Sequence, residues 1–248
     1  MKFLLLEETD STNSYVSVHA SEIESNTMVI ANHQRAGRGQ RGNSWESEPG
    51  KNLLFTMLIR PERFAPRHQF SISEATALAV CDFLRRQGVE AKVKWPNDVY
   101  VGDRKICGIL IEHSVTSEAI EHSRIGVGLN INQEEFVSDA PNPVSLRQLT
   151  GEEYDISRVA AAVGALLESR LATIGDAFGR EAIHAEFKQN LWRGDGKPHT
   201  FRLRGECETF EGVIDDVDPF GPINIINQTT MTAAQYAFKE VEFVLPQK

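Results

Sequence analysis

Residues 91–112, AKVKWPNDVYVGDRKICGILIE, decide the fold class. The stretch consists of three short apolar runs and two turns; the runs lie near 91–95, 99–101 and 105–112, and the turns at 96–98 and 102–103. Apolar runs bounded by Pro, Gly, Asn and Asp are typical of short strands joined by tight connections. We therefore expect consecutive strands of one β-sheet here.

The chain on either side of this stretch predicts more strands and several helices. Further strands are expected at 1–8, 27–33, 52–60 and 124–132. Ala and Leu at helical spacing predict a helix over about 70–87, with Gly88 after its end. Other helices are expected at about 12–20, 156–173 and 177–190. This order predicts an α+β fold in which helices flank a mixed β-sheet.

The pattern changes near Leu191, where short alternating runs begin. They are HTFRLRG (199–205), ETFEGVIDDV (208–217), PINIIN (222–227) and KEVEFV (239–244), with a turn at 218–221. Closely spaced alternating strands are typical of a small β-barrel or sandwich. We therefore expect two domains, a larger one at 1–190 and a β-domain at 191–248.

Composition excludes several classes of protein. The 248 residues carry a formal net charge of −9, which argues against general nucleic-acid binding. No apolar run approaches the roughly 18–20 residues of a membrane span, and the apolar start runs straight into acidic residues, as a strand and not a signal peptide. Three widely spaced cysteines, Cys81, Cys107 and Cys207, favour a reducing, cytoplasmic setting.

A glycine-rich loop is expected at 35–51. Residues 37–42 match G-x-G-x-x-G, but a strand follows them where the dinucleotide fingerprint requires a helix, so that interpretation is rejected. Glycines expose backbone N–H groups to an anion, Arg38 and Arg41 add positive charge, and Trp45 could stack on a base. The alternative is a solvated surface loop.

A second cluster of candidate residues lies in the stretch quoted first. Lys105 opens an apolar strand, so its ammonium could project into a cleft and meet a phosphate or carboxylate. Gly108 inside that strand indicates close approach of a ligand or of another backbone. Asp98 could help to place Mg²⁺, but a simple turn residue is the alternative, as plain solvation is for Lys94 and Lys105.

Residues 10–13, DSTN, offer small hydroxyl and amide groups that could hydrogen-bond a compact polar ring, although a helix N-cap is the simpler reading. The ordered set DSTN (10–13), QRAGRGQRGNSW (34–45), KWPND (94–98), DRKICGILIE (103–112) and GVGLNIN (126–132) resembles the biotin–protein ligases. The resemblance runs from about Ser11 to Asn132, and the tail resembles the SH3-like domain of many members. It implies the biotin and lipoate ligase fold, related to class II aminoacyl-tRNA synthetases, in the monofunctional form without a DNA-binding domain.

The resemblance implies an enzyme that makes biotinyl-5'-AMP from biotin and ATP with Mg²⁺. It would then transfer biotin to a lysine of a biotin carboxyl carrier protein, as a monomer or homodimer that binds neither nucleic acid nor membrane. Arg38 and Lys105 would be catalytic. Biotin would meet Ser11, Thr12, Asn13, Gln34, Arg38, Gly39, Gln40, Lys105 and Gly108. The nucleotide would meet Arg38, Trp45, Lys94, Asn97, Asp98, Lys105 and Asn130, and the metal Asp98 and Asn130.

This chain departs from the family pattern at Gln40 and Asn43, where many relatives carry arginine. Two other functions are considered. A lipoate ligase or octanoyltransferase shares a related fold, but a lipoyl chain needs an apolar tunnel, whereas the polar DSTN segment favours biotin. A non-catalytic biotin-sensing module would not need the basic loop or Lys105.

Overall fold

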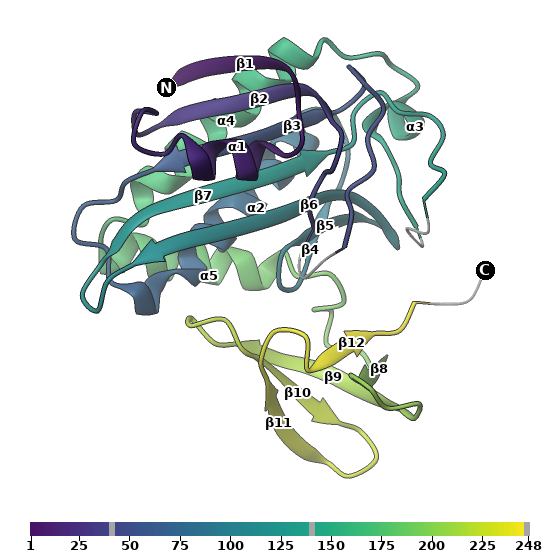
Figure 1. The fold of residues 1–248 in the computed structure, drawn as a ribbon. Helices are drawn as coiled ribbons and strands as arrows, with labels where there is room; N and C mark the ends of the chain where they lie inside the picture. The colour runs from purple at the N-terminus through teal and green to yellow at the C-terminus, as the bar shows by residue number, and fades with distance from the viewer. Residues whose placement is uncertain (40–42, 139–141, 246–248) are drawn as a thin grey trace.

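The computed structural model describes residues 1–39, 43–138 and 142–245, and its larger part is a seven-stranded mixed sheet (Figure 1). The strands lie in the order β1-β2-β3-β7-β6-β5-β4. Their bounds are β1 Lys2–Thr9, β2 Thr27–Gln34, β3 Leu53–Ile59, β4 Lys92–Lys94, β5 Asp98–Val101, β6 Arg104–Val115 and β7 Ile120–Leu129. Strands β1 and β2 are parallel, and every other neighbouring pair is antiparallel.

Helices cover both faces of this sheet (Figure 1). Helix α1 (Thr12–Val18) packs on β2, β3 and β7, whereas α2 (Phe70–Arg86), α4 (Ile156–Thr173) and α5 (Ala177–Gln189) pack together behind the sheet. Alternate residues of each strand point to opposite faces. Accordingly Val29 and Leu58 join the small core under α1, while Met28 and Met57 join the main core under α2.

The second sheet contains five antiparallel strands in the order β11-β10-β9-β8-β12. Their bounds are β8 His199–Leu203, β9 Thr209–Val217, β10 Ile223–Asn227, β11 Thr232–Tyr236 and β12 Val241–Phe243. This agrees with the small β-domain expected for the tail. The exact boundary at residue 190 stays a prediction, and the backbone at 190–192 pairs with Val93 of β4.

The two sheets meet through aromatic side chains. The Trp95 indole donates a 2.8 Å hydrogen bond to the Gly221 carbonyl oxygen, and the Phe238 ring lies 5.3 Å from the Trp95 ring. Phe238 also lies 5.7 Å from the Phe70 ring of α2. The loop that carries Phe238 is therefore packed against the larger sheet.

The predicted α+β architecture, a mixed sheet with flanking helices, is confirmed. Three elements were not predicted, the 3-10 helix η2 (Pro66–His68), the short helix α3 (Leu146–Thr150) and strand β11, and β6 extends to Val115 instead of ending at 112. No helix in the described part of the chain is long and apolar enough to cross a membrane.

Candidate functional site

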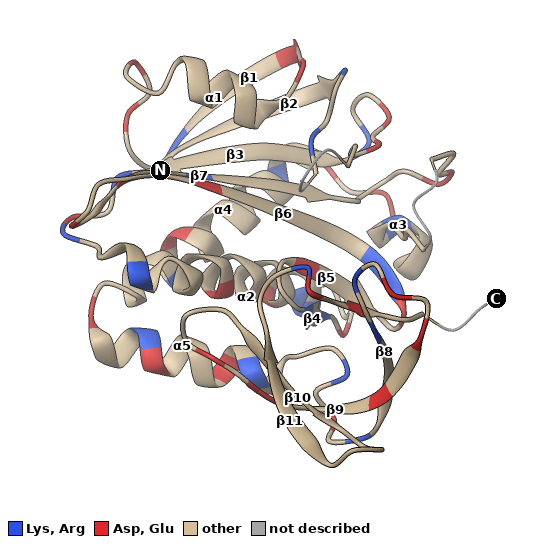
Figure 2. Cartoon of the chain, turned by 60° about the horizontal axis from the view of Figure 1, so that its bottom comes forward, with Lys and Arg blue, Asp and Glu red and all other residues tan. Residues whose placement is uncertain are grey.

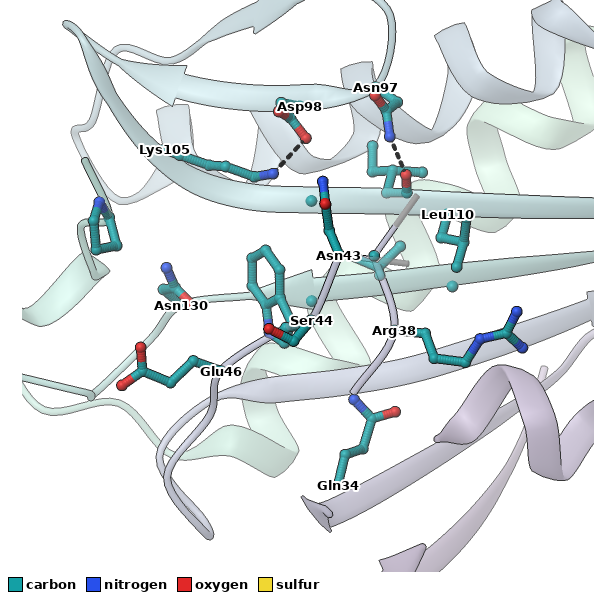
Figure 3. Close-up of a pocket in the computed structure, with 18 of the residues that line it drawn as sticks. Gln34, Arg38, Asn43, Ser44, Glu46, Asn97, Asp98, Lys105, Leu110 and Asn130 are labelled. Carbon is teal, nitrogen blue, oxygen red and sulfur yellow. Dashed lines mark hydrogen bonds and ion pairs between the residues drawn. The ribbon is translucent and has the colours of Figure 1, made fainter. Parts of the chain in front are cut away.

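A cavity of about 840 Å³ opens on the α1 face of the large sheet. Residues of α1, β2, β6 and β7 and of the glycine-rich loop contribute to it. Figure 3 shows Gln34 and Arg38 toward one end and Lys105, Asp98, Asn130 and Glu46 toward the other. The cavity therefore brings the DSTN segment, the loop and the strand-edge lysine together.

The polar end is built by the parallel pair β1 and β2, because parallel strands end at the same edge of a sheet. Ser11, Thr12 and Asn13 follow β1 and are buried, and Gln34 ends β2. The Thr12 backbone N–H and hydroxyl donate to the Gln34 Oε1 atom at 2.7 and 3.1 Å. Since both hydrogen bonds occupy this oxygen, the Gln34 amide offers a ligand its N–H donors.

Ser11 occupies the N-cap position of α1, but its side chain makes no capping hydrogen bond and lines the cavity instead. The Asn13 amide is held by protein groups. Its Nδ2 donates to the Leu110 carbonyl at 3.1 Å and to Glu112 at 3.2 Å, and its Oδ1 accepts from the Thr56 hydroxyl at 2.5 Å. Asn13 is therefore fixed in one orientation.

Gly108 and Gly128 form the floor of the cavity, because they are register partners on β6 and β7. A Cβ at Gly108 would lie 2.7 Å from the Trp45 ring, and one at Gly128 would lie 2.5 Å from it. Only glycine lets the indole lie this close to the sheet. The Trp45 Nε1 atom is buried, and no described residue accepts a hydrogen bond from it.

In the described part of the loop, the Gly39 N–H donates to the Asn43 carbonyl at 2.7 Å, and Arg38 forms an isolated β-bridge with Ser44. Its guanidinium lies 3.4 Å from the Ser14 hydroxyl and 3.8 Å from a Glu112 carboxylate oxygen. About half of the side chain is exposed. The guanidinium is therefore at the cavity edge, next to α1 and β6.

Lys105 pairs with Asp98 at the other end of the cavity, with 2.8 Å between Nζ and Oδ1 (Figure 3). The ammonium also lies 5.5 Å from the centre of the Trp45 ring, a cation–π contact. Asn97 donates to the Ile109 carbonyl and fixes the turn before Asp98. These contacts hold the lysine at the strand edge, facing the cavity.

Asn130 is the strongest candidate metal ligand at this end. Its Nδ2 donates to the Val144 carbonyl at 3.1 Å, whereas its buried Oδ1 has no hydrogen-bond partner among the described residues. The described residues contain no group of three or more His, Cys, Asp or Glu side chains placed to hold a metal ion. A metal here would therefore need oxygen ligands from a substrate.

The structure brings most of the predicted site residues together. The cavity lining includes Ser11, Thr12, Asn13, Gln34, Arg38, Gly39, Trp45, Asn97, Asp98, Lys105, Gly108 and Asn130. Gln40 and Arg41 lie outside the described residues. Lys94 is not among the lining residues of the described chain; its ammonium lies 5.2 Å from the Tyr100 ring and 5.5 Å from the Phe243 ring, and burial lowers its pKa.

Several lining residues were missed by the sequence analysis. They are Asn43, Ser44, Glu46, Phe55, Tyr100, Ile109, Leu110, Gly126, Val127, Gly128, Phe136, Val137, Ser138, Asn142, Pro143 and Lys239. Gly126 and Gly128 carried a signal, two glycines at alternate positions of an apolar strand. Residues 136–138 carried none, since only the fold brings this irregular segment to the loop.

A model of the Biotin/lipoate A/B protein ligase family matches residues 5–130, half of the chain. The chain belongs to this family. The match runs from within β1 to the end of β7 and includes all twelve predicted residues that line the cavity. The family domain is therefore the part of the larger sheet that carries the cavity.

Individual relatives agree with this assignment. The Bifunctional ligase/repressor BirA of Escherichia coli (strain K12) is 39% identical over 124 residues, 50% of this chain and 38% of that protein. The Biotin--[acetyl-CoA-carboxylase] ligase of Paracoccus denitrificans is 34% identical over 158 residues, 61% of this chain and 65% of that protein. The matched regions thus span less than half of the first relative and just under two thirds of the second.

A solved structure of the biotin protein ligase from Aquifex aeolicus, in complex with biotin and ATP, superposes with a TM-score of 0.80. The alignment covers 98% of this chain and 99% of that one at 21% identity. The two chains therefore share a fold over their whole length, the C-terminal β-domain included.

Proposed function

We propose that this chain is a biotin–protein ligase that forms biotinyl-5'-AMP from biotin and ATP and transfers biotin to a lysine of a biotin carboxyl carrier protein. One observation carries the proposal. A single cavity is lined at one end by Ser11, Thr12 and Gln34 and at the other by Lys105 and Asn130. A polar ring and a phosphate, joined by an acyl chain, match this arrangement of groups.

The polar end suits a ureido ring. The ring carbonyl needs donors, which the N–H groups of Gln34 and the Ser11 hydroxyl supply, and the ring N–H groups need acceptors. The Trp45 indole, which packs on the glycine floor, would offer an apolar wall to the remainder of the ligand. A lipoyl chain would leave the buried Ser11 without a polar partner, which costs binding free energy.

In the first step a biotin carboxylate oxygen attacks the α-phosphorus of ATP, and the bond from this phosphorus to the pyrophosphate oxygen breaks. Lys105 would stabilise the charge that develops on the carboxylate and phosphoryl oxygens, and Arg38 would do so from the loop. Arg38 must turn from Ser14 and Glu112 to reach that position, since its guanidinium lies against both of them. The protein contributes positioning and charge neutralisation.

In the second step the neutral amine of the carrier lysine attacks the acyl carbon, and the bond to the AMP phosphate oxygen breaks. The products are an amide, AMP and the proton that the amine nitrogen loses. Enclosure of the mixed anhydride by the loop and by Trp45 would protect it from water until the carrier arrives. We further propose that the enzyme works in the cytoplasm, where its cysteines Cys81, Cys107 and Cys207 stay reduced.

Magnesium fits this end of the cavity as a substrate-bound ion. Asn130 supplies a buried oxygen without a hydrogen-bond partner among the described residues, and Asp98 supplies a carboxylate that now pairs with Lys105. Mg²⁺ is usually held by one or two carboxylates together with substrate phosphates, and it would neutralise phosphate charge. Asn130 would orient its ligand oxygen through the hydrogen bond to Val144.

Mass spectrometry tests the proposed reaction directly. The purified protein is mixed with biotin, Mg²⁺·ATP and a biotin carboxyl carrier domain, and parallel mixtures contain lipoate or octanoate. We expect one biotinyl group on the carrier and pyrophosphate in solution, with no transfer of the other acids. Adenylate formed from lipoate but not from biotin would refute the proposal in favour of a lipoate ligase, and adenylate from neither acid would favour a binding module.

A further inference from the structure

Glu46 joins two segments of the cavity wall that are distant in sequence. One of its carboxylate oxygens accepts a hydrogen bond from the Val137 backbone N–H at 2.8 Å, and the other accepts one from the Ser138 N–H at 2.9 Å. Gln133 donates a third hydrogen bond at 3.3 Å. Figure 3 shows Glu46 at the same end of the cavity as Asn130. The side chain therefore bridges the loop and the segment after β7.

The base of this bridge is rigid. Gln133 is fully buried, and its Oε1 accepts hydrogen bonds from the Asn52 side chain at 2.6 Å and from the Glu48 N–H at 3.1 Å. Asn52 in turn accepts a hydrogen bond from the Ile131 N–H at 2.9 Å. This buried network ties the start of β3 to the end of β7 and sets the position from which Glu46 reaches out.

Gln148 and Gln133 hold the start of this segment through hydrogen bonds to the Glu134 and Glu135 carbonyl oxygens at 2.6 and 2.8 Å, whereas the backbone N–H groups of Val137 and Ser138 beyond it are bound by Glu46. Residues 134–138 form neither helix nor strand, and the Val137 side chain is 88% exposed. A segment with little buried apolar surface depends on its hydrogen bonds for order. Hydrogen bonds to a charged acceptor are the stronger kind. The Glu46 carboxylate is thus the main described attachment of Val137 and Ser138.

The charge state of Glu46 agrees with this role. Burial raises the pKa of the carboxyl, but the hydrogen bonds from Ser138, Val137 and Gln133 outweigh burial and leave the pKa below its ordinary value. A carboxylate on the wall of a cavity for phosphates would repel the ligand if it faced it. Here both oxygens are directed to backbone N–H groups, which offset the charge.

We propose that Glu46 is a positioning residue that holds residues 136–138 as a wall of the cavity next to Trp45, and that this wall retains the nucleotide part of the adenylate. The inference rests on the proposed function. Glu46 contacts no reacting atom in this scheme. Its loss should therefore affect retention of biotinyl-AMP more than the chemical step.

The test compares Glu46→Ala and Glu46→Gln with Glu48→Gln, a matched control that removes the same charge two residues further on. Hydrogen–deuterium exchange without ligand reports on the wall. We expect the Val137 and Ser138 amides to exchange roughly tenfold faster in Glu46→Ala, less so in Glu46→Gln, which keeps one acceptor oxygen, and at the wild-type rate in the control.

Dissociation of biotinyl-AMP, followed by chase with unlabelled ligand, reports on retention. We expect roughly tenfold faster release from Glu46→Ala, with single-turnover adenylate formation at saturating substrates within about threefold of wild type. Unchanged amide exchange in Glu46→Ala would refute the claim that Glu46 holds residues 136–138 in place. Faster exchange with unchanged release of biotinyl-AMP would refute the claim that these residues retain the adenylate. A wild-type protein that forms no adenylate would instead refute the proposed function, and the exchange data alone would still decide whether Glu46 holds the wall.

Discussion

Lys105 and Asp98 face each other across 2.8 Å at the edge of the cavity, and the ammonium also contacts the Trp45 ring. A fixed ammonium needs no reorganisation when negative charge develops beside it, which is the physical basis of its proposed catalytic role. The same geometry means that removal of the lysine exposes a carboxylate to the incoming phosphates. Both effects oppose adenylate formation.

We therefore expect Lys105→Ala to slow adenylate formation by roughly 10²–10³-fold, the scale of losing one preorganised stabiliser. Pyrophosphate release under single-turnover conditions measures the effect. Lys92→Ala is the control, because it removes an exposed ammonium from strand β4, outside the cavity lining. A near-normal rate for Lys105→Ala would remove this residue from the catalytic set.

Gly128 allows a second prediction about a single residue. An added Cβ would lie 2.5 Å from the Trp45 ring, so Gly128→Ala should push the indole off the floor. We expect at least tenfold weaker biotinyl-AMP binding by calorimetry, with a melting temperature close to wild type because the ring can move toward the open cavity. Gly175→Ala, whose Cβ would meet nothing closer than 3.8 Å, should leave binding unchanged. Equal binding by both variants would contradict the proposed position of Trp45.

The residues that the sequence analysis found and those it missed differ in a physical way. Gln34, Arg38 and Lys105 belong to motifs with their own spacing, so they could be found without coordinates. Lys94 belongs to such a motif too, yet it lies between the Tyr100 and Phe243 rings. The second ring belongs to the C-terminal domain, and its position depends on how the two sheets pack, which one-dimensional patterns do not encode.

At the scale of elements, one ion-pair network links the three long helices behind the sheet, α2, α4 and α5. Arg170 of α4 donates to Asp82 of α2 at 2.6 and 2.9 Å and to Glu186 of α5, at 2.7 Å for one of its oxygens. The hydrogen bonds raise the pKa of the Arg170 guanidinium, and those from Arg170 lower the pKa of Glu186. The network therefore favours the charged forms of Arg170 and Glu186.

Loss of this network should reduce stability. We expect Arg170→Ala to lower the free energy of unfolding by about 2 kcal/mol, the range for hydrogen bonds between charged groups after allowance for the solvent exposure of Glu186. Urea unfolding measures the change. Arg158→Ala on the same helix is the control, since its side chain is 89% exposed. A change of similar size in both variants would contradict the stabilising role of the Arg170 ion-pair network.

The same network gives a pH dependence with a definite sign. The pKa of Glu186 is lower in the folded than in the unfolded chain. Its contribution to the free energy of unfolding is therefore fully present above its unfolded pKa of about 4.5. It is lost as the pH falls through the folded value. We expect urea midpoints of wild type to fall more steeply below pH 4.5 than those of Arg170→Ala. Parallel curves would show that Glu186 does not depend on Arg170.

Elements with a long periodic pattern were predicted well. The helix expected at 156–173 is α4, and that expected at about 70–87 is α2. Strand β11, TAAQY, was missed because it is almost wholly exposed and thus lacks the apolar alternation that marks a half-buried strand. Helix α3 was missed because five residues are too few to show a period.

At the scale of the whole molecule, the small sheet is fixed to the larger one by the loop between β11 and β12. Phe238 of this loop packs on Trp95 and Phe70, and the adjacent Lys239 lines the cavity. The two sheets are therefore expected to unfold as one cooperative unit, since the interface contains part of the main apolar core.

We expect Phe238→Ala to lower the free energy of unfolding by about 1–2 kcal/mol, below the range for a fully buried ring because Phe238 is 40% exposed. For a chain of this size that corresponds to a fall of about 4 °C in the melting temperature by calorimetry. Phe178→Ala, at a side chain that is 82% exposed, should not change it. Two separate transitions in wild type would show that the sheets unfold independently.

The paired glycines under the indole also limit what redesign could achieve. Gly108 and Gly128 present only main chain to the Trp45 ring. No substitution at either position could therefore let the indole lie deeper and enlarge the cavity. Variants that accept bulkier acids would need smaller side chains elsewhere in the cavity lining, for example at Phe55 or Leu110. A side chain at either glycine would instead push the indole into the cavity, which would favour smaller acids.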